Sequence, residues 1–191
     1  MRSSIKYKLI LCFLATLIAF PCFPASAKNR ADIVDMVVDK SGKDLEVSFR
    51  LENCFTPKME EAIQNGVPTT FRILVAVEKP AMLLIKSQVV DFMLEHTIKY
   101  NRLTSEFQIS LPEHPGKTLI TRDFSEAKRW MSTVENLPVM PTCWLRQEQE
   151  YSLKVKAELS KVELPLFFRY ILFWVALWDF ETDWQKVNFS M

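Results

Sequence analysis

The chain has 191 residues, of which 49% are hydrophobic and 25% charged, and its formal net charge at pH 7 is +1. This near balance of charge argues against proteins that bind nucleic acid or an anionic membrane surface through a strongly basic face. Three glycines in the whole chain argue against a solenoid or a glycine-rich barrel.

The first 27 residues have the organisation of a cleaved signal peptide. Three basic residues precede an apolar run, Leu9–Phe20, and the small-residue pattern Ala25-Ser26-Ala27 follows. The run is shorter than the roughly 20 residues that a membrane span needs. We therefore expect cleavage after Ala27, export to the periplasm and one domain over residues 28–191, with 21 basic and 23 acidic residues.

The exported part begins with a predicted β-hairpin. The stretch DLEVSFRL alternates strictly, with apolar residues on one face and polar residues on the other, which is typical of a half-buried strand. The turn-forming sequence SGK precedes it, so residues 31–38 are expected to be its hairpin partner.

A short helix with clear end signals follows the hairpin. Thr56 is a suitable N-cap, Pro57 fits the first helical position and Gly66 can adopt the left-handed conformation that ends a helix. Pro68 prevents continuation. The buried stripe is expected to contain Met59, Ala62 and Ile63.

Alternation then predicts three more strands and a second helix. The strands cover residues 71–77, 88–100 and 105–111, and a shorter one follows at 117–121. The helix is expected over residues 123–137, capped by Asp123, with a stripe made of Phe124, Ala127, Met131 and Val134. The sequence PVMPTCW that follows is interpreted as irregular.

Two strands are predicted near the C-terminus. YSLKVKAEL alternates cleanly, and WDFETDWQKVNF is expected to place Trp178, Phe180 and Trp184 on one face. The pattern as a whole predicts an α+β, mainly β fold: an antiparallel twisted sheet or sandwich of about seven or eight strands, with two short inserted helices.

The most apolar stretch of the exported part is LPLFFRYILFWVALW, residues 164–178, in which Arg169 is the only charge. It is too short to cross a bilayer. Three interpretations remain open: a buried segment, an exposed surface for a partner or apolar ligand, and peripheral contact with a membrane. The candidate binding residues are Phe168, Arg169, Ile171, Trp174 and Trp178.

Few residues indicate chemistry. Cys54 and Cys143 can form a disulfide in an oxidising compartment, and two separate thiols are the alternative. His96 falls on the inward side of its strand, which favours a core histidine over a catalytic base, and His114 lies in a predicted loop. No nucleotide-binding, hydrolase or metal motif occurs, so we expect no cofactor and no metal.

Three carboxylates at period-two spacing, Asp179, Glu181 and Asp183, could bind a cation. The interpretation that we favour is a solvated face whose carboxylates pair across the sheet with Lys154 and Lys156.

Three ordered motifs resemble a bacterial family of exported proteins, domain of unknown function 4390. They are the helix ending AIQNGVP, the hairpin HTIKYNRLTSEF and the late WDFETDW. The resemblance implies a one-domain envelope protein and supplies no catalytic residues. The sequence thus favours a non-enzymatic exported protein that binds an envelope partner or an apolar ligand through its aromatic C-terminal segment. The alternatives are a hydrolase assembled from distant residues and a structural or regulatory envelope subunit.

Overall fold

The structure is a computed structural model that describes residues 31–79, 87–160 and 180–191. Nine strands, two α-helices and one short 3-10 helix lie in these ranges. In chain order they are β1 Asp32–Asp39, β2 Asp44–Glu52, α2 Pro57–Gln64, β3 Thr69–Lys79, β4 Ser87–Asn101, β5 Glu106–Ser110, β6 Thr118–Thr121, α3 Phe124–Ser132, β7 Thr133–Pro141, η1 Thr142–Trp144, β8 Glu150–Leu159 and β9 Gln185–Ser190.

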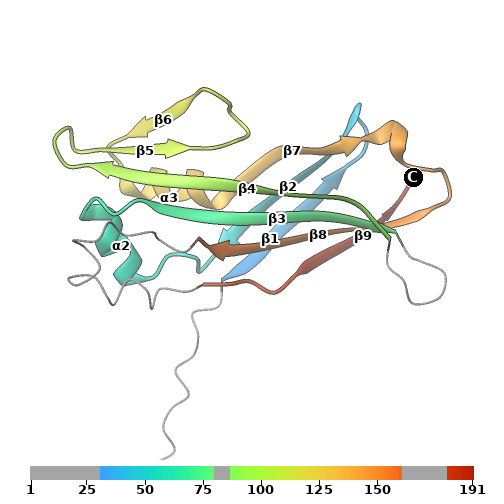
Figure 1. The fold of residues 1–191 in the computed structure, drawn as a ribbon, viewed down its shortest axis with the longest axis horizontal. Coiled ribbons are helices and arrows are strands. Elements are labelled where there is room, and N and C mark those ends of the chain that lie inside the picture. The colour runs from blue at the N-terminus through green and yellow to red at the C-terminus, as the bar shows by residue number, and fades with distance from the viewer. Residues whose placement is uncertain (1–30, 80–86, 161–179) are drawn as a thin grey trace, which may run out of the picture.

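The strands form two antiparallel sheets that share one hydrophobic core (Figure 1). The smaller sheet has the order β1-β2-β7, and the larger has the order β6-β5-β4-β3-β8-β9. The predicted mainly β class, with an antiparallel twisted sheet or sandwich and two short helices, is confirmed. The described residues contain more strands than the predicted seven or eight, because β7 was missed.

Alternation placed the core correctly in the central strands. In β2 the inward residues Leu45, Val47, Phe49 and Leu51 are all buried, and β2 pairs with β1 as the predicted hairpin. The inward residues of β3 are equally buried, namely Phe71, Ile73, Val75 and Val77. β3 lies between β4 and β8 and is one of the two central strands of the larger sheet.

Helix α2 begins and ends where its sequence signals predict. The Thr56 side chain accepts a hydrogen bond from the Met59 backbone N–H at 3.2 Å. Gly66 has a φ of +88°, the left-handed conformation that favours glycine. The three residues of the predicted stripe, Met59, Ala62 and Ile63, are buried.

The second helix is shorter than predicted. α3 starts at its Asp123 cap but ends at Ser132, and Val134 belongs to β7. The prediction that residues 138–144 are irregular was also wrong for the part of β7 that includes Pro138 and Pro141. β7 is an edge strand of its sheet, where a proline need not donate to a neighbouring strand.

The prediction of a strand over residues 178–189 holds only in part. The regular strand β9 begins at Gln185, and Glu181 forms an isolated bridge with Glu158. Phe180 is fully buried, whereas Trp184 is 47% exposed, so these two aromatic residues do not share a buried face. Trp178 and Asp179 lie outside the described residues.

The two open sides of the sandwich are closed differently. β1 contacts β8 and β9 along one side. On the other side α3 contacts β4, β5 and β6 of the larger sheet and β2 and β7 of the smaller one (Figure 1). Of the helices in the described ranges, none is long and apolar enough to span a membrane.

Candidate functional site

The residues predicted to bind a partner, Phe168, Arg169, Ile171, Trp174 and Trp178, lie outside the described residues. The described residues on either side of that segment are held together. The Leu159 N–H donates to the Phe180 carbonyl at 3.0 Å, and the Thr182 N–H donates to the Ala157 carbonyl at 2.9 Å. The chain therefore leaves β8 and returns toward β9 at the same place on the sheet.

Packing strengthens this junction. Phe180 has no exposed surface, and its ring meets Phe71 of β3 edge-on at 4.9 Å between centroids. Phe71 also contacts Phe55 at 5.1 Å. Through these rings Phe180, the first described residue after the segment, packs into the core at the end of the sheet where the chain enters α2.

The best-defined polar cluster in the described residues surrounds His96 of β4. Its side chain has no exposed surface. Nδ1 lies 3.0 Å from the Met131 carbonyl oxygen in the last turn of α3. Nε2 lies 2.7 Å from Glu113 Oε1 in the loop between β5 and β6. The predicted inward orientation of His96 is confirmed.

The partners of His96 determine where its protons lie. A carbonyl oxygen only accepts, so Nδ1 carries a proton and donates it to Met131. A second proton lies between Nε2 and Glu113, since two lone pairs would otherwise face each other at 2.7 Å. Neither ring nitrogen is then available to take a proton from a substrate.

The Glu113 carboxylate is held from one side. Its side chain is 10% exposed, and its Oε2 atom is buried with no hydrogen-bond partner among the described residues. Burial raises the pKa of Glu113, but the hydrogen bond from His96 and the positive charge of that ring outweigh burial, and the pKa lies below its ordinary value. The pair is therefore an imidazolium and a carboxylate.

The other titratable candidates have ordinary surroundings. His114 is exposed in the loop that was predicted for it. Lys156 pairs with Glu181, as expected, whereas Lys154 pairs with Glu78 at 2.7 Å. Asp179 lies outside the described residues. Within the three described ranges, no group of three or more His, Cys, Asp or Glu side chains could hold a metal ion.

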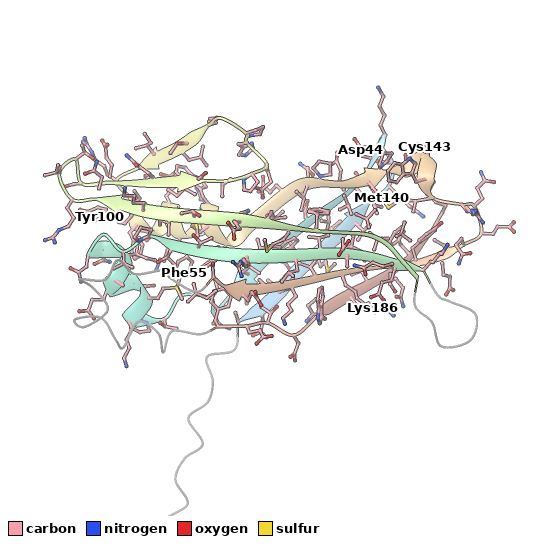
Figure 2. All side chains as sticks on the ribbon, in the orientation of Figure 1. Asp44, Phe55, Tyr100, Met140, Cys143 and Lys186 are labelled. Atoms are coloured by element: carbon pink, nitrogen blue, oxygen red, sulfur yellow. The ribbon has the colours of Figure 1, made fainter. Side chains whose placement is uncertain are left out.

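The structure does not form the proposed disulfide. Both thiols are free, with Cys54 buried and Cys143 exposed. Cys54 follows the end of β2, while Cys143 follows Thr142, whose N–H donates to the carbonyl of Lys43 just before β2 begins. A nine-residue strand is about 30 Å long, and a disulfide needs Cα atoms within about 7 Å. Figure 2 shows Cys143 near Asp44, far from Phe55, which follows Cys54.

We predict that the two thiols react differently. Burial raises the pKa of Cys54 to about 12, so this thiol is protonated and shielded at neutral pH. A maleimide added to the purified native protein should label Cys143 rapidly and Cys54 only after unfolding, as read by peptide mass spectrometry. Recovery of a peptide in which the two residues are crosslinked would contradict the structure.

The fold and its polar cluster define a two-sheet antiparallel β protein with a buried histidine–carboxylate pair. The model of a protein family described as domain of unknown function, DUF4390, matches residues 28–188, so the chain belongs to that family. No curated protein and no solved structure matches it.

Sequence reasoning found His96 but not its partners. The alternation of β4 showed that the ring points inward, which implied that its nitrogens need partners. Glu113 comes from a loop, and the Met131 partner is a backbone carbonyl, so neither has a sequence pattern that could reveal the contact. A glutamate beside prolines, in PEHPG, looks like any solvated loop residue.

Proposed function

We propose that this protein is a non-enzymatic periplasmic protein that binds an envelope partner or an apolar ligand through residues 164–178. The observation that carries the proposal is the composition of this segment, fifteen residues with one charge, in a chain that begins with the features of an export signal. Apolar patches of this kind on exported proteins mark contact surfaces.

The described residues on either side of the segment support this function. Backbone hydrogen bonds join Leu159 to Phe180 and Ala157 to Thr182, and Phe180 is buried. Fixing the ends of a loop lowers the conformational entropy that binding would otherwise remove. A recognition segment gains affinity from such an attachment.

Protection of three of the four edge strands in the described residues favours binding by side chains over binding by strand addition. β6 has four residues and lies between Lys117 and Arg122, and β7 contains Pro138 and Pro141. The irregularity in β1 includes Asp35 at a φ of +52°. Short strands, flanking charges, prolines and bulges all hinder the pairing of a new strand.

The hydrolase alternative gains no support from the buried pair. A triad base needs one nitrogen on the nucleophile and the other on an orienting carboxylate. In His96, Nε2 contacts the Glu113 carboxylate and Nδ1 contacts a backbone carbonyl, so neither nitrogen faces a nucleophile. The His96 side chain also has no exposed surface.

The test replaces three residues of the segment by serine: Phe168, Ile171 and Trp174. We expect an unchanged melting temperature, together with at least about hundredfold weaker binding of an anilinonaphthalene probe or loss of crosslinks to envelope proteins, because each buried apolar side chain contributes about 1.5–3 kcal/mol. Trp144→Ser is the matched control, since Trp144 is a 63% exposed aromatic residue in η1, outside the substituted segment.

Three outcomes distinguish the alternatives. Unfolding of the triple variant would show that the segment belongs to the core and would remove the basis of the proposal. Loss of crosslinks without loss of probe binding would identify a structural or regulatory envelope subunit. Binding to phospholipid vesicles alone, abolished in the triple variant, would identify peripheral membrane contact.

A further inference from the structure

One imidazole ring joins three separate elements of the fold. His96 lies on β4 in the larger sheet, Glu113 lies in the loop formed by residues 111–117, and Met131 lies in the last turn of α3. The loop's other hydrogen bonds in the described structure are internal, from His114 N–H to the Leu111 carbonyl and from Lys117 N–H to the His114 carbonyl. Polar attachment of the loop to the sheet and to α3 therefore depends on the contact with His96.

The contacts of His96 with Glu113 and Met131 require two protons on the His96 ring and none on the Glu113 carboxylate. With a proton on each ring nitrogen, His96 donates to both partners and its charge is neutralised by Glu113. If one proton is removed, a nitrogen lone pair faces either the Glu113 carboxylate or the Met131 carbonyl. If one is added to Glu113, the buried imidazolium loses its counter-charge. Since Glu113 Oε2 has no partner among the described residues, nothing there replaces the lost contact.

The surrounding charges are engaged elsewhere. On the outer face of the sheet, Arg72 of β3 pairs with Glu95 of β4 at 3.1 Å. On α3, Lys128 pairs with Glu60 of α2 and Arg129 with Glu126. In the loop, exposed His114 adds positive charge near Glu113. On β3, the residue opposite His96 is Phe71, which is uncharged.

We propose that the His96–Glu113 pair is a proton-controlled clamp that holds loop 111–117 and the end of α3 against the larger sheet. Loss of the shared proton opens the clamp. α3 closes one side of the sandwich and covers core residues with its buried Ala127 and Met131. Opening therefore exposes apolar core on that side in response to pH. The clamp is independent of the binding segment in residues 164–178.

Amide hydrogen exchange of the purified protein, measured from about pH 5 to about pH 9, tests the clamp across the range of imidazole titration. After correction for intrinsic exchange, protection of residues 111–117 and of the end of α3 should fall by up to about tenfold per pH unit over the range in which opening releases one proton, as linkage to one proton requires. The NMR signal of the His96 ring reports the protonation of the ring in the same samples. His114→Asn assigns that signal, because the chain has two histidines.

The decisive variant is Glu113→Gln. The glutamine amide can donate to neutral Nε2 while Nδ1–H still donates to Met131, so a neutral clamp stays closed as pH rises. Protection in this variant should be constant over the range in which the native protein loses it. Glu106→Gln is the matched control, because it removes the ion pair between Glu106 of the neighbouring β5 and Arg122. Its protection should depend on pH as in the native protein.

Two results would overturn the clamp. One is constant protection of loop 111–117 in the native protein while the His96 signal titrates. The other is a Glu113→Gln profile that matches the native one. If Glu113→Gln unfolds globally, the exchange measurement on the native protein alone decides whether the clamp exists.

Discussion

Replacing Phe180 by alanine is expected to lower the free energy of unfolding by about 3–5 kcal/mol, the usual cost of removing a buried phenylalanine ring. Phe180 has no exposed surface and packs edge-on against Phe71, whose other neighbour is Phe55. The ring also stands where the chain re-enters the sheet, beside the hydrogen bond from Leu159. Its removal leaves a cavity beside the hydrogen bonds that join the described residues on either side of residues 161–179.

Trp184→Ala is the matched control, because it removes a larger aromatic ring four residues away. Trp184 is 47% exposed, and among the described residues Lys156 lies over its ring, with Nζ 5.9 Å from the ring centroid. An exposed cation–π contact contributes about 0.5–1 kcal/mol, so we expect a loss no larger than that. Urea unfolding at neutral pH measures both. Equal losses of unfolding free energy in the two variants would contradict the burial of Phe180 at this junction.

These two residues also show what a pattern of alternation can and cannot determine. Strict alternation fixed the inward faces of β2 and β3, because a strand buried on one side leaves no freedom in its register. Phe180 and Trp184 have the same parity, yet only Phe180 is buried. The regular ladder begins at Gln185, so parity along residues 180–184 does not report a common face.

The missed strand β7 has a different cause. Pro138 and Pro141 are poor strand residues by local propensity, but an edge position tolerates them. Val134 fits a helical stripe after Met131, and it fits an inward strand position equally well. Pairing with β2 decides between helix and strand for this stretch, and it joins residues about 90 apart in sequence. The pairing includes the hydrogen bond from Asn136 N–H to Ser48 Oγ, 88 residues away.

The polar cluster was predictable only in part for the same physical reason. An inward histidine implies partners, but their identity depends on tertiary placement of a loop and a helix end. The disulfide hypothesis failed because compartment and cysteine count constrain which bridges can persist, while Cα separation decides which can form. Cys54 and Cys143 belong to opposite ends of β2.

Replacing His96 by leucine is expected to cost about 3–5 kcal/mol at neutral pH, because it leaves the buried Glu113 carboxylate without its counter-charge. The double variant His96→Leu/Glu113→Leu should be more stable than the single variant, since two apolar side chains of suitable size can replace a buried ion pair at little cost. A double-mutant cycle by urea unfolding measures the coupling between the two residues.

The stability of His96→Leu relative to the native protein should change with pH in one direction, which the pKa of Glu113 determines. In the native protein the pKa of Glu113 is lowered, so the pair's contribution is present above the unfolded pKa of this group and is lost as pH falls through the folded one. Without His96, burial is the largest influence that remains, and it raises the pKa of Glu113. As pH falls, Glu113 is therefore neutralised at a higher pH in His96→Leu than in the native protein. This neutralisation makes the variant more stable relative to the native protein. The difference in unfolding free energy should shrink as pH falls. A difference that is constant with pH, or a double variant less stable than His96→Leu, would show that His96 contributes through packing and not through the charge of its partner.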